Sequence, residues 1–128
     1  MGMETNFQTA AGLIDHARAC GKLKALLSQL RRDYQRANIP FPIREDHLAS
    51  ARSEILSQEL EENLYLLLME RFDQYLNLMY AADVPERAFR SVQPRDAVEA
   101  AREVAFLLLK REWQKLGYRF RFGPSKNT

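Results

Sequence analysis

Apolar side chains recur every three or four residues between positions 23 and 37, and this spacing constrains the fold more than any other feature of the sequence. The stripe consists of Leu23, Leu26, Leu27, Leu30, Tyr34 and Ala37. Residues three and four apart lie on one side of an α-helix, and the other side of this segment is rich in lysine and arginine. The segment therefore predicts an amphipathic helix that buries one face.

A second apolar stripe precedes this helix and consists of Phe7, Ala10, Ala11, Ile14 and Ala17. Gly21 separates the two stripes, and glycine tolerates the left-handed backbone conformation that commonly ends helices. We therefore expect the first helix to stop near Cys20 and residues 1–38 to form a helical hairpin. Residues 39–45 hold Pro40 and Pro42, which disfavour helix and predict an extended linker whose apolar side chains dock on the core.

The main helices are expected within residues 46–117. Asp46 can cap a helix, and nothing before Ala82 forces a break, so we favour one long helix, straight or kinked near Ser57, with two helices as the alternative. The run at residues 64–69 is apolar on every side of such a helix, which predicts burial on several sides. A short helix should follow Pro85, and a last helix should run from the region of Pro94 to Gly117.

The period of the sequence changes after Gly117. Residues 118–122 alternate aromatic and basic side chains, which is typical of an extended segment with two unlike faces. We therefore expect residues 118–128 to form an extended tail. The 128 residues predict a single all-α domain, a bundle of about four to five helices with a short extended C-terminal segment.

The sequence contains no recognisable catalytic, metal-binding or cofactor-binding pattern. Its five glycines form no phosphate-binding loop. His16 and Cys20 share a helix face, but two side chains fall short of the usual four metal ligands, and the negative end of a helix does not favour a thiolate. We therefore predict a protein that is not an enzyme and that needs no metal or cofactor.

Cys20 is the only cysteine, and no run approaches the roughly 20 apolar residues of a membrane span. The N-terminus shows no pattern of a signal peptide. These features predict a cytoplasmic protein without a membrane partner.

Basic and aromatic residues gather near the C-terminus and form the candidate interaction site. They are Lys110, Arg111, Lys115, Tyr118, Arg119, Phe120, Arg121 and Phe122. The aromatic side chains can pack on the bundle, bind a protein partner, or stack on nucleic-acid bases while the arginines neutralise phosphates. An exposed edge of this kind can also pair with a second copy of the chain.

Residues 10–37 resemble the C-terminal helix pair of effector-associated domains, which are death-domain-like helical adaptors of bacterial conflict systems. The shared pattern is Leu13-Ile14-x-x-Ala17, followed by Gly21-x-Leu23-x-x-Leu26 and a basic end at Arg31 and Arg32. In that family the pair closes the domain, whereas here it opens the chain. The resemblance implies a non-enzymatic adaptor that binds a like domain through charged helical faces.

The leading functional hypothesis is a helical protein-interaction module or small assembly subunit, which binds a protein partner or associates with itself. The alternative is an accessory protein that binds nucleic acid through the C-terminal segment. A third hypothesis is a small-molecule or lipid-like ligand held between the helices.

Overall fold

A computed structural model describes residues 8–48, 50–90 and 96–122, with the backbone alone at 120–122. The described residues form six α-helices and a short 3-10 helix, and no strand. The helices are α1 (Ala10–Ala19), α2 (Leu23–Arg36), η1 (Glu45–His47), α3 (Ser53–Glu70), α4 (Phe72–Ala81), α5 (Glu86–Arg90) and α6 (Ala97–Phe122). The predicted all-α fold is confirmed.

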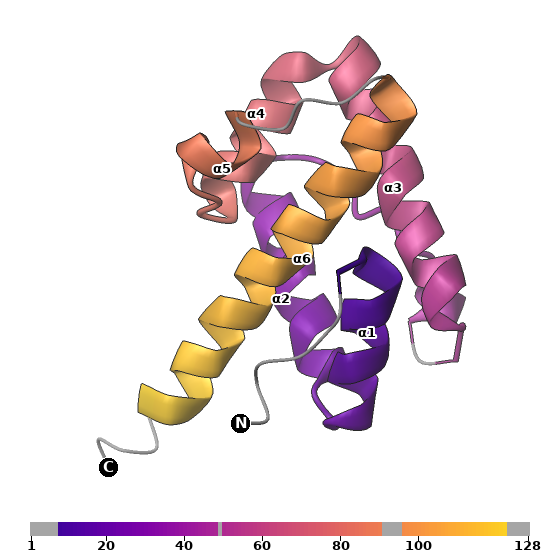
Figure 1. Cartoon of the computed structure of the whole chain (residues 1–128), viewed down its shortest axis with the longest axis vertical. Helices are drawn as coiled ribbons and strands as arrows, with labels where there is room; N and C mark the ends of the chain where they lie inside the picture. The colour runs from indigo at the N-terminus through magenta and orange to yellow at the C-terminus, as the bar shows by residue number, and fades with distance from the viewer. Residues whose placement is uncertain (1–7, 49, 91–95, 123–128) are drawn as a thin grey trace.

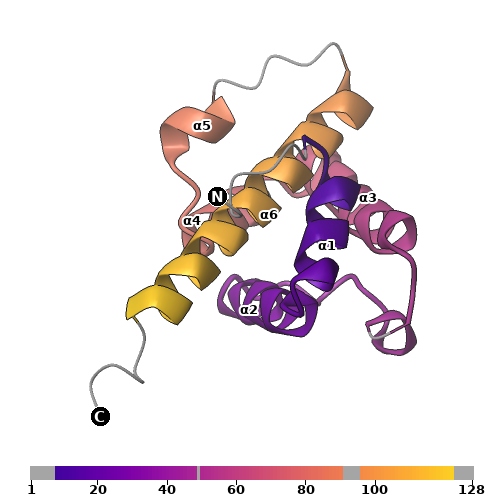
Figure 2. The same cartoon turned by 60° about the horizontal axis from the view of Figure 1, so that its bottom comes forward.

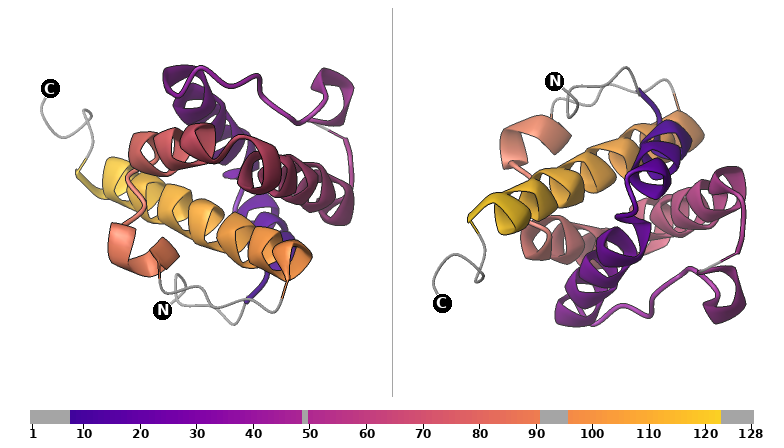
Figure 3. Two further views of the ribbon diagram at one scale, coloured as in Figure 1. Left: turned by 90° about the horizontal axis from the view of Figure 1, so that it is seen from above. Right: turned by 90° about the horizontal axis from the view of Figure 1, so that it is seen from below.

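Helix α6 is the axis of the bundle. Helices α1, α2, α3 and α5 pack against it, as Figures 1 and 2 show. Helix α4 lies against α2 and α3, and the view from above shows α3 and α4 following one another on one side of α6 (Figure 3). The core lies where these helices meet, and its fully buried leucines include Leu13, Leu26, Leu30, Leu60, Leu64 and Leu108. Each contributes roughly 1.5–3 kcal/mol through burial.

Three helices end with the same backbone motif, in which a residue just after the helix adopts the left-handed conformation. After α1, Gly21 has φ 71°, the Lys22 N–H donates to Ala17 O at 2.8 Å, and the Gly21 N–H donates to Arg18 O at 3.0 Å. This is the Schellman arrangement, and it confirms the predicted helix end. Asn38 and Asp83 take the same left-handed conformation after α2 and α4, with φ of 63° and 67°.

The linker after α2 docks on the core as predicted. Ile39 and Ile43 are buried, and the Phe41 ring meets the Tyr34 ring edge-on at 5.5 Å between centroids. At the start of the bundle, the hydroxyl of Thr9 accepts the Gly12 N–H at 3.0 Å and caps α1.

The prediction of one long helix over residues 46–82 is wrong. Asp46 lies in η1 and pairs with Arg44, α3 begins only at Ser53, and the chain breaks again at Arg71, which has φ −142° and ψ 61°. The second break turns α4 onto α2, where Tyr75, Leu78 and Met79 are buried. A straight continuation of α3 would carry these side chains past the end of the bundle. This break also explains why the described residues hold more helices than the predicted four to five.

The predicted helix end at Gly117 is also wrong. Helix α6 continues through Gly117 to Phe122, so residues 118–122 are helical rather than extended. Leu116 is buried, and the Arg119 guanidinium donates to Gln29 of α2 at 3.3 Å, so contacts with the bundle continue across the glycine. Residues 123–128 of the predicted tail lie outside the described residues, as do residues 1–7 of the predicted hairpin.

Candidate protein-interaction site

Three basic residues of the candidate C-terminal site have partners inside the protein. The Lys115 ammonium group lies 2.9 Å from the carboxylate of Asp33. The Arg111 guanidinium lies 3.5 Å from the carboxylate of Asp83, and Arg119 is bonded to α2 as described above. The carboxylates of Asp33 and Asp83 offset the charges of Lys115 and Arg111, which reduces the positive charge available to a phosphate backbone.

The remaining residues of that site also lie on α6 rather than on an extended segment. Tyr118 is 59% exposed, and the Lys110 ammonium group lies 5.9 Å from the centre of the Phe106 ring. Phe120, Arg121 and Phe122 belong to the end of α6, where only the backbone is described.

A buried polar cluster joins α2 to α6, and the sequence patterns above did not identify it. The Gln29 side-chain amide donates to Glu112 twice, to the main-chain oxygen at 2.8 Å and to Oε1 at 2.7 Å. The carboxyl groups of Glu112 and Asp33 are within hydrogen-bonding reach of each other, and Lys115 contacts both. Glu112 and Asp33 are both almost wholly buried.

Burial raises the pKa of Glu112 to about 8, and a hydrogen bond with Asp33 and its negative charge act in the same direction. Lys115 and Gln29 oppose the rise only in part. Among the described residues, Oε2 of Glu112 receives no donor. A proton on this carboxyl group therefore completes the cluster, and Glu112 is held as the neutral acid at neutral pH. Neither Asp33 nor Glu112 lines one of the described pockets, so we interpret this pair of acids as structural.

The signal for this cluster was present in the helical period. Glu112 follows Leu108 and Leu109 at three- and four-residue steps and precedes Leu116, so it lies on the apolar stripe of α6. Asp33 follows Leu30 by three residues in the same way. A carboxylate within an apolar stripe predicts a buried acid, and that test identifies both residues.

His16 and Cys20 contact each other, with the thiol sulfur 3.6 Å from Nε2 of the imidazole. The imidazole ring also meets the Trp113 ring edge-on at 5.4 Å between centroids. His47 lies elsewhere and binds Glu59 at 2.8 Å, which ties η1 to α3. Within residues 8–48, 50–90 and 96–122, no three His, Cys, Asp or Glu side chains are grouped so that they can hold a metal ion.

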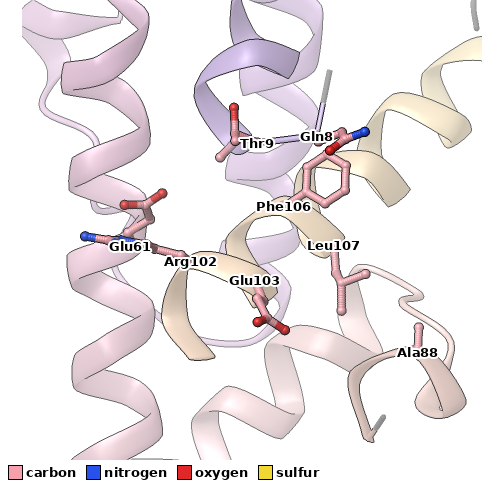
Figure 4. A pocket seen from close by; sticks show the side chains of 9 residues that line it. Gln8, Thr9, Glu61, Ala88, Arg102, Glu103, Phe106 and Leu107 are labelled. Atoms are coloured by element: carbon pink, nitrogen blue, oxygen red, sulfur yellow. The ribbon is translucent and has the colours of Figure 1, made fainter. Parts of the chain in front are cut away.

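A surface pocket of about 420 Å³ lies between α1, α3, α5 and α6 (Figure 4). Its lining consists of Gln8, Thr9, Ala10, Glu61, Ala88, Arg102, Glu103, Phe106 and Leu107. The one hydroxyl among them, on Thr9, is engaged as the cap of α1. Partial burial raises the pKa of Glu61, while the charge of Arg102 acts in the opposite direction. These residues include no nucleophile paired with a base.

The strongest candidate for an interaction site is an apolar surface where α3 gives way to α4. The sequence predicted burial on several sides for residues 64–69. Leu64 and Leu67 are indeed buried, but Leu66 is 46% exposed and Met69 is 57% exposed. Phe72, at the start of α4, is 53% exposed. The described fold therefore covers only one side of this apolar run.

Acidic side chains border this surface. Glu62, Tyr65, Leu66, Met69 and Glu70 follow the helical spacing of a single face, and all five are exposed. Asp73 is exposed beside Phe72, and Arg71 is the one exposed cation within residues 62–73. We call Glu62, Tyr65, Leu66, Met69, Glu70, Phe72 and Asp73 the α3–α4 face.

No protein-family model, curated protein or solved structure matches this chain.

The α3–α4 face itself has the composition of a binding surface. Single exposed apolar side chains are ordinary on protein surfaces, whereas several together mark a binding surface. Four large apolar side chains lie within eight residues here, with charged side chains around them. An apolar centre with a polar rim is typical of protein–protein interfaces. None of the helices in the described ranges is long and apolar enough to cross a membrane.

Proposed function

We propose that this protein is a non-enzymatic helical module that binds a protein partner through the α3–α4 face. The observation that carries the proposal is the exposure of Leu66, Met69 and Phe72, between 46% and 57%, within seven residues of the chain. Covering side chains of this size contributes roughly 25 cal/mol for each Å² of apolar surface removed from water. Met and aromatic residues are also enriched at interface cores.

Other features support a binding role over a catalytic one. Neither member of the buried acid pair Asp33 and Glu112 lines a described pocket, and the His16–Cys20 pair at the end of α1 has no third ligand among the described residues. The resemblance of residues 10–37 to effector-associated adaptors favours the same class of function.

Photo-crosslinking in cells of the source organism tests the proposal. A photoreactive amino acid placed at Leu66 or Met69 is expected to give a discrete crosslinked protein product. The same amino acid at Tyr118 provides a control, because that side chain is also exposed but lies on α6. The double variant Leu66→Glu/Met69→Glu should abolish binding of the captured partner, while Tyr118→Glu should leave it intact.

Two outcomes would contradict the proposal. If positions 66 and 69 give no protein product, the α3–α4 face does not bind a protein. If product forms at position 118 instead, the interaction surface lies at the C-terminal end of α6.

A further inference from the structure

A second surface of the protein has the opposite charge and lies at the start of α2. It is a groove of about 520 Å³, lined by Arg18, Gly21, Leu23, Lys24, Leu27, Ser28, Arg31, Phe41, Glu45 and Leu48. Leu23 and Leu27 form a buried floor, and Phe41 and Leu48 are half-buried beside it. We call it the α2 groove; its volume is within the range of about 300–1,000 Å³ that is typical of binding pockets.

The rim of the α2 groove is basic. It carries Arg18, Lys24 and Arg31 against the single acid Glu45. Arg31 bonds Glu45 at 3.0 Å and lies 5.5 Å from the centre of the Phe41 ring, which holds the guanidinium group over the apolar floor. The groove therefore presents an apolar surface with a net charge of two positive units, from three cations and one anion. Its chemistry fits an apolar segment bordered by acids.

The α3–α4 face has the matching chemistry. It presents the apolar side chains of Tyr65, Leu66, Met69 and Phe72, and its three acids outnumber the neighbouring Arg71 by two charges. Opposite charges at the edge of a contact steer association and disfavour wrong partners. The acidic apolar face and the basic apolar groove are thus complementary in both respects.

One molecule cannot bring its own two surfaces together. The Arg18 guanidinium donates to Ala51 O at 2.7 Å, which places the groove beside the start of α3. The α3–α4 face lies at the other end of α3, whose 18 residues span about 27 Å. Figure 1 shows the turn between α1 and α2 at the bottom of the molecule and the junction of α3 with α4 at the top.

We propose that the α3–α4 face of one copy of this chain docks in the α2 groove of a second copy. The inference rests on the proposed function and names its partner as this protein itself. The contact joins two different surfaces, so the copy at each end of an assembly retains one unoccupied surface unless the copies form a closed ring.

Light scattering on the purified protein over a wide concentration range tests the inference. The wild type is expected to gain mass as its concentration rises. The groove variant Lys24→Glu/Ser28→Glu makes the α2 groove acidic, like the unchanged α3–α4 face. The face variant Glu62→Lys/Glu70→Lys makes the α3–α4 face basic, like the unchanged groove. Each variant alone should therefore associate at least tenfold more weakly than the wild type. Mixing the two variants pairs an acidic with a basic surface and should restore association.

Lys110→Glu/Gln35→Glu is a matched control, because it makes the same change of charge as the groove variant at exposed positions outside both surfaces. Circular dichroism verifies that each variant is folded. A second measurement avoids charge reversal altogether. A Ser28→Cys chain mixed with a Met69→Cys chain, both carrying Cys20→Ser, should form a mixed disulfide under mild oxidation with copper phenanthroline.

If the wild type stays monomeric at every concentration and the Ser28→Cys and Met69→Cys chains form no mixed disulfide, the inference is overturned. Crosslinks from positions 66 and 69 to a different protein would then preserve the proposed function. A groove variant that associates like the wild type, or a mixture of variants that fails to associate, overturns the pairing of these two surfaces.

Discussion

Replacing Glu112 by glutamine removes the ionisable group at the centre of the buried cluster between α2 and α6. The pKa of Glu112 rises from an ordinary 4.5 to about 8 in the folded protein. Below about pH 4.5 the carboxyl group is protonated in both the folded and the unfolded chain, so it imposes no cost on folding. Between about pH 4.5 and 8 the unfolded chain releases this proton while the folded protein retains it, and the free energy of unfolding falls.

The size of this effect follows from the shift in pKa. At about 1.4 kcal/mol for each pH unit, the loss of stability reaches roughly 5 kcal/mol above pH 8. Glutamine has the shape of the protonated acid. Its carbonyl oxygen can accept from Gln29, and its amide can donate to Asp33. We therefore expect Glu112→Gln to match the wild type near pH 4.5 and to be more stable by about 3–5 kcal/mol near pH 8.

Urea unfolding followed by tryptophan fluorescence measures this directly, because Trp113 is the only tryptophan and is buried next to Glu112 in the chain. The difference in unfolding free energy between variant and wild type should grow as pH rises from 5 to 8. Glu103→Gln provides a control at an exposed position of the same helix. Equal pH profiles for Glu112→Gln and the wild type, or a variant less stable at pH 8, would refute the account of the cluster.

Three backbone substitutions test the helix ends and the course of α6 by urea or thermal unfolding. Gly21→Ala should destabilise the protein by about 1 kcal/mol, since alanine is strained at φ 71°; an unchanged midpoint would contradict this. Asn38→Gly should be neutral or stabilise by up to about 1 kcal/mol because it relieves the same strain after α2, and a clear loss would argue against it. Gly117→Ala should stabilise by roughly 0.5–1 kcal/mol, since the position is helical and a Cβ there meets nothing within 4 Å; destabilisation would indicate the break that the sequence first suggested.

Local sequence signals predicted the elements that depend on local chemistry. The stripe from Leu23 to Ala37 forms α2, and Gly21 ends α1 because few other residues adopt its backbone conformation without strain. The helix after Pro85 was also predicted, and it forms α5. In each case the determinant lies within a few residues of the element.

The errors arose where distant contacts override local preference. The break at Arg71 has no proline or glycine beside it, and α4 turns because its apolar side chains find a partner in α2. Alternation in residues 118–122 suggested an extended segment, but the end of α6 remains bonded to α2 through Arg119. A short alternating run carries too little information to outweigh a helix that is already formed.

The candidate site was predicted only in its general character. An apolar run at residues 64–69 was evident from the sequence, but which side of it remains exposed depends on how α3 lies against α1 and α6. Two residues of the interaction surface first inferred at the C-terminus form internal ion pairs: Arg111 contacts Asp83, and Lys115 contacts Asp33 across 82 positions of the chain. Helical periodicity places Asp33 on a buried stripe, but it does not reveal which distant cation pairs with it.

The position of α6 as the axis of the bundle has a consequence for synthesis of the protein. Helices α1 and α2 emerge from the ribosome before α6, yet the helix on which they pack is completed only at Phe122, 86 residues after Arg36. At roughly 5–20 residues per second, that delay lasts roughly 4–17 seconds. During this interval Gln29 and Asp33 lack their partners on α6, so the nascent chain presents its amphipathic helices to chaperones before it can fold.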